Sequence, residues 1–406
     1  MSRNADNGEV EHSELVTLLS PEGLRLLDSL PRYETGADVL KMVSALRSQG
    51  HPPALVAAVL TQAKLRSRAR GKFGQFAERM LFTESGLEQA TRLRVAAIHA
   101  GRFRAAGVTR VADLGCGIGG DAMAMASLEL EVTAVERDEV TAAIAAYNLA
   151  PWPAVTVLAQ DAASTDLSAV DGVYLDPARR TGGHGQTTRI ADPDDYSPSL
   201  DEALGLAAGR AAGIKLGPGI DRDLIPDEAE AQWVSVDGQV VELGLWLGAA
   251  AREGIGRSAL VLGPEGTAEL SAGADSDDAE PRDLGEYLYE PDGAVIRARL
   301  IGDLARRLGA GMLSDGIAYL TADRAVPTPF AACFRVLERF PLDERLLRRE
   351  LAARGIGTLE IKKRGVDVDP AALRRRLSLR GGRSATLFLT RVAGRHSALL
   401  AERVTA

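Results

Sequence analysis

The sequence predicts an α/β protein, with a doubly wound parallel sheet, an N-terminal helical region and a C-terminal α+β domain. Three observations predict this fold class. From residue 108 onward, short β-rich runs alternate with helical stretches, as they do when helices cover both faces of a parallel sheet. Residues 1–100 follow helical spacing instead. After residue 329 strands and helices alternate again, over about the length of a small domain.

The predicted elements follow from apolar runs and their boundaries. Strands are expected at 108–114, 131–136, 155–158, 172–176, 213–216, 232–236, 240–247 and 258–262. The C-terminal part should run strand 332–338, helix 343–354, strand 358–363, helix 370–377 and strand 385–392. Further helices are expected at 86–105, with the run Thr83-Glu84-Ser85 as a candidate cap, and at 119–128, 138–149, 199–210 and 294–308.

The chain has 406 residues, more than one ordinary core holds, so several domains are expected. We predict a helical region over 1–105, an α/β domain over 106–265, a connecting segment over 266–328 and a basic α+β domain over 329–406. Residues 264–285 are rich in Gly, Ala, Ser and Asp, which favours a loop or an exposed insertion.

The composition is that of an ordinary globular protein, with 46% hydrophobic and 26% charged residues. The two cysteines, Cys116 and Cys333, lie far apart, so we expect neither a metal site nor a disulfide framework. The N-terminus lacks the apolar segment of a signal peptide, and no apolar run approaches the ~20 residues of a membrane span. We therefore expect a soluble, cytoplasmic protein with no membrane partner and no metal. The sequence gives no oligomeric state.

The net charge of −8 conceals two basic blocks. The C-terminal basic block, from Phe330 to the end, has 17 Lys and Arg against 8 Asp and Glu, a net of +9. The N-terminal basic block, residues 61–110, has 11 Lys and Arg against 3 Glu, a net of +8. Clustered cations suit a polyanion such as RNA. Each block is equally compatible with a solvated helix face.

A Gly-rich turn joins the first predicted strand to a helix, between Val111 and Asp121, in a Rossmann-like arrangement. Gly115, Gly117 and Gly119 let the backbone turn sharply and approach a ligand closely. The helix N-terminus that follows favours a negative or polar group. Alone, this loop is compatible with NAD, FAD or no ligand at all.

Acidic residues at the ends of the next two strands narrow the choice of ligand. Glu136 lies 21 residues after Gly115, where a carboxylate can accept both hydroxyl hydrogens of a ribose, and Arg137 follows it. Asp161 and Ala162 follow the third strand, where an acid can bind an adenine amino group. The loop and the two acids together predict a site for a nucleoside cofactor.

The fourth strand ends in Asp176-Pro177, and with this motif the series resembles the class I S-adenosylmethionine-dependent methyltransferases. NAD dehydrogenases share the loop and the first acid, but not the later two motifs. The resemblance implies that Asp113 and Gly115 contact the methionine part of the cofactor. It also implies that Glu136 holds the ribose and Asp161 the adenine.

The fourth-strand motif also concerns the methyl acceptor. In amino-methylating members of this class, Asp/Asn-Pro-Pro-aromatic accepts hydrogen bonds from the target amino group and stacks on the base. Here Asp176 and Pro177 are kept, while Ala178 and Arg179 replace the second Pro and the aromatic residue. The resemblance implies Asp176, Pro177 and Arg179 as catalytic residues. Arg179 or Arg180 can stack by its guanidinium plane or pair with a phosphate, or the two form a surface pair beside the crevice.

Over most of the chain from about residue 60, the sequence resembles a bacterial group of these enzymes with a C-terminal THUMP-like domain. The resemblance is carried by residues 72–91, 176–180, 287–292 and 362–365. THUMP domains in other RNA-modifying enzymes bind RNA, so the resemblance implies an RNA substrate. The candidate substrate contacts are Arg180, Lys215, Lys362, Lys363, Arg364, Arg374, Arg375 and Arg376. Lys215, near the end of the fifth strand, is equally compatible with a simple strand-end lysine.

The leading hypothesis is therefore an S-adenosylmethionine-dependent methyltransferase that modifies a base nitrogen in tRNA or rRNA. One alternative is methylation of a small molecule or a protein, which requires the basic blocks to face away from the crevice. Another is a non-catalytic RNA-binding protein that retains the cofactor, which the Ala178-Arg179 departure leaves open.

Overall fold

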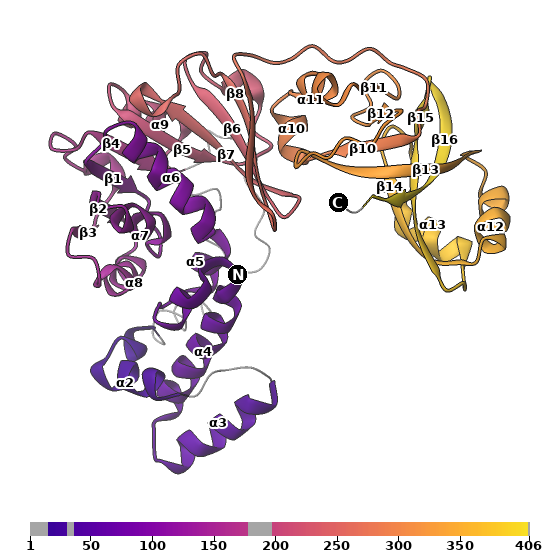
Figure 1. The fold of residues 1–406 in the computed structure, drawn as a ribbon. Helices are drawn as coiled ribbons and strands as arrows, with labels where there is room; N and C mark the ends of the chain where they lie inside the picture. The colour runs from indigo at the N-terminus through magenta and orange to yellow at the C-terminus, as the bar shows by residue number, and fades with distance from the viewer. Residues whose placement is uncertain (1–14, 31–35, 178–196, 405–406) are drawn as a thin grey trace, which may run out of the picture. The chain divides into compact units, whose positions relative to one another are not determined.

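The protein is seen in a computed structural model that describes residues 15–30, 36–177 and 197–404 (Figure 1). The chain packs as two compact units. The first comprises Met1–Leu216, Ile220–Leu224 and Leu245–Ala251, and the second comprises Gly217–Gly219, Ile225–Gly244 and Arg252–Ala406. The four domain ranges predicted from the sequence remain a proposal.

Nine strands form one sheet in the order β3-β2-β1-β4-β5-β7-β6-β8-β9. Their bounds are β1 Arg110–Leu114, β2 Glu131–Glu136, β3 Val155–Ala159, β4 Gly172–Leu175, β5 Ala211–Leu216, β6 Glu230–Val236, β7 Gln239–Leu247, β8 Arg257–Gly263 and β9 Gly266–Ala272. Strands β1 to β5 pair in parallel, which confirms the predicted doubly wound sheet. The strand order reverses between β1 and β4, and at such a switch point ligands bind outside the carboxyl ends of the strands.

The helical region and the sheet of the first unit share one hydrophobic core. Phe73, Phe103, Met123 and Tyr174 belong to the same buried cluster, although they come from three helices and a strand. The helices of this unit are α2 Pro21–Ser29, α3 Gly36–Ser48, α4 Pro53–Phe73, α5 Glu84–Gln89, α6 Leu93–Ala105, α7 Gly120–Ser127, α8 Glu139–Leu149 and α9 Leu200–Ala207. Short 3-10 turns lie at η1 Gly74–Glu78, η2 Ala162–Ser164, η4 Arg222–Leu224 and η5 Gly248–Ala250. The N-terminal helices therefore support the sheet directly.

The single helix predicted over residues 86–105 is wrong, because the structure has two helices there, α5 and α6. The cause is Lys72, whose Nζ donates hydrogen bonds of 2.7 Å to the carbonyls of Leu87, Glu88 and Ala90. The last carbonyls of a helix need such partners when the helix stops. Thr83 caps α5 as predicted, accepting from the backbone N–H of Gly86.

Two buried amides hold the extended residues that precede α5. The side chain of Gln62 pairs with both backbone groups of Phe82, at 2.6 and 3.0 Å. The side chain of Asn148 pairs with both backbone groups of Leu81, at 2.7 and 3.0 Å, and donates to the carbonyl of Ile118 at 2.9 Å. Because Ile118 lies in the Gly-rich turn, these bonds fasten the helical region to that turn.

In the second unit, β6 and β7 are joined by Asp237-Gly238, whose φ angles of 50° and 78° are those of a type I′ turn. Strand β8 pairs with β6 in parallel and with β9 in antiparallel orientation. The loop predicted over 264–285 is thus wrong for β9. Its small and polar residues have weak β propensity, and the pairing with β8 supplies what the local sequence lacks.

A seven-stranded sheet has the order β11-β12-β10-β13-β16-β15-β14. Its strands are β10 Tyr287–Pro291, β11 Gly311–Met312, β12 Leu320–Ala322, β13 Ala331–Pro341, β14 Ile356–Lys363, β15 Arg383–Val392 and β16 Arg395–Arg403. The helices of this unit are α10 Gly293–Arg297, α11 Ile301–Leu308, α12 Glu344–Ala353 and α13 Pro370–Leu377. Three of these strands (β10, β11 and β12) and both α10 and α11 lie within the segment predicted as a connection.

The C-terminal strands and helices follow the predicted series, with one addition. Strand β16 was not predicted, because its Ser-Ala-Leu-Leu-Ala run has little β character; pairing with β13 and β15 fixes it. The helix predicted over 294–308 is two helices, separated near Arg299, whose φ is 58°. Helices α12 and α13 pack on one face of the sheet, over a core that includes Leu347, Leu373 and Leu387.

Candidate active site

The Gly-rich turn after β1 has the backbone that its glycines predict. Gly115, Gly117 and Gly119 have φ angles of 87°, 54° and 88°, which other residues rarely adopt. A Cβ at position 115 would lie 3.2 Å from the carbonyl oxygen of Asp176, and one at position 119 would lie 2.9 Å from Leu149 Cδ1. Gly115 is therefore needed where the ends of β1 and β4 approach each other.

Asp113, in β1, is buried with 1% of its surface exposed. Its Oδ2 has no hydrogen-bond partner among the described residues. Burial raises the pKa of this carboxyl well above its usual range, and the charges of Asp121 and Asp176 raise it further. An unpartnered buried carboxylate oxygen beside a glycine cradle fits a cationic ligand group, as the α-ammonium of a methionine moiety is.

Glu136 ends β2 and reaches the Gly-rich turn. Its Oε2 accepts from the N–H of Gly117 at 3.1 Å and its Oε1 from the N–H of Asp138 at 3.0 Å. Asp161 is exposed at the end of β3, where it accepts from the N–H of Ala163 at 2.9 Å. The structure thus brings both acids to the same carboxyl edge of the sheet as Asp113. Their ribose and adenine roles remain predictions.

The fourth and fifth strands end in an ion pair. Lys215 of β5 donates from Nζ to Asp176 Oδ2 at 2.5 Å and to Thr91 Oγ1 at 2.9 Å. The side chain of Lys215 is 6% exposed and that of Asp176 25%. Pro177 is buried beside them. Arg179 and Arg180, also predicted as site residues, lie outside the described residues, as does Ala178.

Sequence reasoning missed a buried polar cluster behind this pair. His99 Nδ1 lies 2.8 Å from Asp121 Oδ1 and 3.0 Å from the hydroxyl of Tyr174. Burial acts to raise the pKa of Asp121, but the hydrogen bond and charge of His99, the charge of Lys215 and a hydrogen bond with Thr91 outweigh it and lower the pKa. These residues come from α6, α7 and β4, and no sequence spacing joins them. The sequence offers one hint of this cluster, because the helix that precedes the Gly-rich turn contains a histidine.

The N-terminal basic block is largely engaged within the first unit. Arg68 forms an ion pair with Glu84, and Lys72 caps α5. The guanidinium of Arg102 lies 5.0 Å from the ring centroid of Trp246. These side chains support the helices, which favours a structural role for this block.

The C-terminal cations differ in how they are engaged. Lys362 Nζ pairs with Glu290 at 2.7 Å and with Glu360 at 3.2 Å. Arg364 lies over the ring of Tyr319, 5.0 Å from its centroid. Lys362 is therefore already neutralised by protein carboxylates.

Among the cations of α13 and the end of β14, some bind protein groups and others are exposed. Arg374 Nε donates to the carbonyl of Leu359 at 3.0 Å, and Arg376 Nε pairs with Glu344 at 2.9 Å. Arg375 and Lys363 are exposed. Of the predicted contacts in this region, Arg375 and Lys363 are the best placed to meet a ligand.

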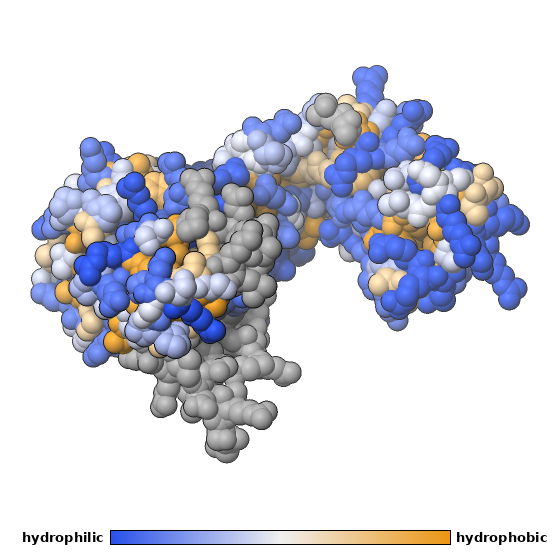
Figure 2. Space-filling view, turned by 90° about the horizontal axis from the view of Figure 1, so that it is seen from below, coloured by the Kyte–Doolittle hydropathy of each residue, from blue (hydrophilic) through white to orange (hydrophobic). Residues whose placement is uncertain are grey.

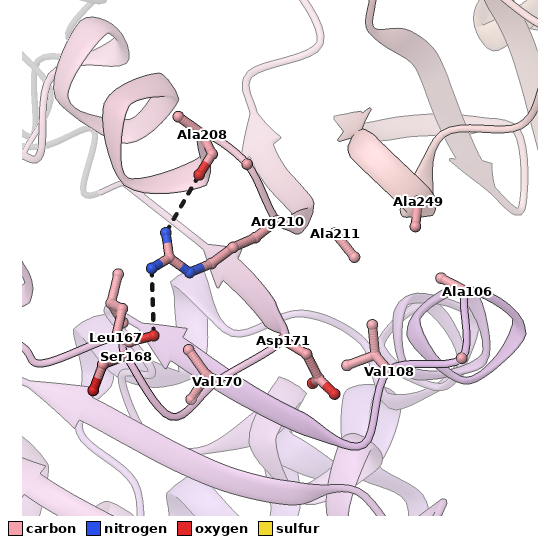
Figure 3. Close-up of a pocket in the computed structure, with 12 residues that line it drawn as sticks. Ala106, Val108, Leu167, Ser168, Val170, Asp171, Ala208, Arg210, Ala211 and Ala249 are labelled. Atoms are coloured by element: carbon pink, nitrogen blue, oxygen red, sulfur yellow. Dashed lines mark hydrogen bonds between the residues drawn. The ribbon is translucent and has the colours of Figure 1, made fainter.

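A pocket of about 490 Å³ lies at the opposite, amino-terminal edge of the first unit's sheet (Figure 3). Arg210 points into it, and its guanidinium donates to the carbonyls of Ala208 at 3.3 Å and Leu167 at 3.4 Å. Asp171 accepts from the backbone N–H groups of Thr109 and Arg110. The charged groups of this pocket thus bind backbone groups, and the predicted cofactor residues lie at the other edge.

The fold is a doubly wound α/β sheet, and the residues predicted to bind a nucleoside cofactor gather at its carboxyl edge. An uncharacterised S-adenosylmethionine-dependent methyltransferase of Mycobacterium tuberculosis H37Rv is 37% identical to this chain over 336 residues, covering 81% of this chain and 90% of that protein. Its counterpart in strain CDC 1551 matches to the same extent. The chain therefore belongs to the S-adenosylmethionine-dependent methyltransferases, and S-adenosylmethionine is its cofactor.

The C-terminal resemblance and the fold are also confirmed. Residues 331–403 match the family described as THUMP domain-like, and residues 11–69 match one described as Domain of unknown function (DUF8688). A crystal structure from Porphyromonas gingivalis W83, provisionally assigned as a methyltransferase, has a TM-score of 0.70 at 22% sequence identity. It covers 92% of this chain and 100% of that chain, so the two share their fold throughout.

Within the described residues, no group of three or more His, Cys, Asp or Glu is arranged to hold a metal ion. In the same part of the chain, no helix is both long and apolar enough to cross a membrane.

Proposed function

We propose that this methyltransferase methylates a nitrogen atom of a base in RNA, in tRNA or rRNA. The observation that carries the proposal is the THUMP domain-like match over residues 331–403, joined in one chain to an Asp176-Pro177 motif at the cofactor edge. When bound, S-adenosylmethionine would supply an electrophilic methyl group: the acceptor nitrogen would bond to its carbon as the C–S electron pair goes to sulfur, and the N–H proton would leave to solvent. Positioning then supplies most of the catalysis.

The residues of the chain have separate parts in this proposal. Asp113, Gly115, Gly117 and Gly119 bind the methionine end of the cofactor, with Glu136 and Arg137 at the ribose and Asp161 and Ala162 at the adenine. Asp176, next to Pro177, accepts a hydrogen bond from the N–H of the base. This bond orients the lone pair of the base nitrogen toward the methyl group. Arg179 and Arg180 stack on the base or pair with its phosphate.

Lys363 and Arg375 bind the RNA backbone in this proposal. Both are exposed in the THUMP-like region, which we assign to a domain over 329–406. Hydrophilic residues cover most of the face of this region that Figure 2 shows (right). Electrostatic capture of this kind is independent of sequence and weakens with salt.

The test is mass spectrometry of nucleosides from total RNA of cells with and without the gene. We expect one N-methylated nucleoside to disappear in the deletion and to return with the wild-type gene. It should not return with a gene carrying Asp176→Ala. Identical nucleoside profiles in the two strains would exclude RNA and leave a small-molecule or protein acceptor, or a protein that only binds RNA.

A further inference from the structure

Lys215 stands beside the proposed acceptor-binding carboxylate. The parallel register of β4 and β5 pairs Leu175 with Ile214, so the next residues, Asp176 and Lys215, are neighbours at the carboxyl edge. Side chains alternate along a strand, and this places both residues on the same face of the sheet. The hydrogen bond of 2.5 Å between them agrees with that placement.

The burial of the pair differs between its two members. The lysine side chain is 6% exposed, against 25% for Asp176. A substrate arriving at this edge meets the carboxylate and not the ammonium. Lys215 therefore acts on a substrate through Asp176.

Thr91 holds the ammonium from the other side. It is 5% exposed, and its Oγ1 accepts from Lys215 Nζ at 2.9 Å. The hydroxyl also hydrogen-bonds Asp121, which in turn contacts His99 at 2.8 Å. A threonine hydroxyl has one proton, so it accepts from Lys215 and donates to Asp121. The hydrogen bonds thus run from Lys215 to Thr91 and from Thr91 to Asp121. They anchor Lys215 to the helical region through Thr91.

Stability alone does not account for a lysine at this position. Burying an ion pair costs so much solvation that apolar residues of similar volume serve stability as well or better. The charges of Asp113 and Asp176 repel each other, and the carboxyl of Asp113 is also repelled by the charge of Asp121. The ammonium of Lys215 offsets that repulsion and fixes which oxygen of Asp176 faces the protein.

We propose that Lys215 is the positioning residue of the acceptor site, holding the carboxylate of Asp176 turned toward the acceptor nitrogen, and that Thr91 holds Lys215. The helical region thereby contributes to catalysis through Thr91, without touching cofactor or acceptor. This inference rests on the proposed function in that it takes Asp176 as the group that binds the acceptor N–H.

Two variant pairs test the inference, with RNA from cells lacking the gene as acceptor and methyl-labelled S-adenosylmethionine as donor. Lys215→Met should lower kcat about 100-fold, the scale of a misplaced group, and leave the dissociation constant for S-adenosylmethionine nearly unchanged. It should also move the acidic limb of the pH–rate profile to higher pH. Thr91→Val should do the same to a smaller degree, while Thr91→Ser, which keeps the hydroxyl, restores the wild-type profile.

The matched control is Arg66→Met, which removes another largely buried cation of this unit, one that donates to the carbonyl of Met80. It should leave the kcat and the pH profile unchanged. Wild-type profiles for both Lys215→Met and Thr91→Val would overturn the inference. If Lys215→Met fails to fold, the Thr91 pair decides.

A second readout needs no acceptor and separates this inference from the proposed function. In protein labelled with ¹³C at aspartate Cγ, the titration of Asp176 is followed by NMR. Lys215→Met should move its midpoint to higher pH, because an opposite charge beside the carboxylate is lost, and Arg66→Met should not. An unmoved midpoint overturns the positioning role. If the midpoint moves but wild-type protein methylates no RNA, the RNA proposal fails and the positioning role stands.

Discussion

Each unit contains a cluster of charges around a buried carboxylate, and the hydrogen bonds and ion pairs of the two clusters are complete to different degrees. In the second unit, Arg252 pairs with Glu230 at 2.5 Å and with Glu269 at 2.6 Å. Ser258 and Gln232 add hydrogen bonds of 2.5 Å to Glu269. Burial acts to raise the pKa of Glu269, but the hydrogen bonds of Arg252 and Ser258 outweigh it and lower the pKa. This cluster is complete within the protein.

The cluster of the first unit is incomplete. Asp113 has an oxygen without a described partner and a raised pKa, while Asp121 nearby has a lowered one. A buried charge without a partner costs free energy, so it persists where a ligand supplies the partner. Burial of charge alone therefore does not mark a site; Asp113 is distinguished by an unsatisfied carboxylate oxygen that lies next to the Gly-rich turn.

The largest effect should come from breaking the complete cluster. Arg252→Met leaves Glu230, which is fully buried, without its cation, and should lower the free energy of unfolding by about 3 kcal/mol, the lower end for buried pairs because Arg252 itself is 36% exposed. Urea unfolding followed by tryptophan fluorescence measures it. The affinity for S-adenosylmethionine should not change.

The control for this prediction is Arg257→Met. Arg257 pairs with Asp275, whose side chain is 43% exposed, and such pairs contribute about 0–1 kcal/mol. Equal losses for the two variants would contradict the distinction between a buried cluster and a surface pair.

The second-largest effect should come from replacing Asp113, whose carboxylate has the unsatisfied oxygen. Asp113→Asn removes the charge but keeps the shape, and a hydrogen bond to a charged group is worth about 1.5–3 kcal/mol. We expect the dissociation constant for S-adenosylmethionine to rise about 10- to 100-fold by calorimetry, while the cofactor-free protein becomes no less stable. Glu131→Gln, exposed at the other end of β2, should change neither quantity. Wild-type affinity in Asp113→Asn would sink the cofactor role of this residue.

The same carboxyl predicts how cofactor binding depends on pH. The pKa of Asp113 is raised in the native protein. At pH values between its usual pKa and the raised one, the native state therefore binds more protons than the unfolded state. The free energy of unfolding therefore falls as the pH rises through that window. A cationic ligand group favours the ionised form, so binding should release up to about one proton and tighten with rising pH.

Calorimetry in two buffers of different ionisation enthalpy counts the released protons. Asp113→Asn should abolish the release that this carboxyl contributes. A proton count equal in wild type and variant would show that Asp113 is not the coupled group.

The sequence was sufficient to predict features that depend on neighbouring residues, or on motifs that follow the strands in a fixed order. The Gly-rich turn, Glu136 and Asp176 each lie at the end of a strand that a short apolar run in the sequence predicts. Parallel strands end at one edge, so their assembly into a site followed from the fold class. The family comparison then confirmed the cofactor.

What the sequence did not predict depends on contacts between distant residues. His99 and Tyr174 lie 75 residues apart, and only the packing of α6 on β4 brings them together. Strands β9 and β16 are fixed by their neighbours and not by their own side chains. Whether a cation is available to a ligand also depends on its neighbours, as the two lysines at the end of β14 show.

The smallest predicted effect concerns those two lysines, whose charges differ in the way the two clusters do. Lys362 is neutralised by Glu290 and Glu360, while Lys363 is exposed. A lysine that contacts a phosphate releases about one counterion, so Lys363→Ala should flatten the slope of log K against log salt by about 0.7–0.9. Filter binding of total tRNA at several salt concentrations measures the slope. Lys362→Ala should change it far less, because that ammonium already has protein carboxylates as partners. A larger change for Lys362→Ala than for Lys363→Ala would mean that RNA displaces the glutamates, and that a satisfied charge in this protein is still available to a ligand.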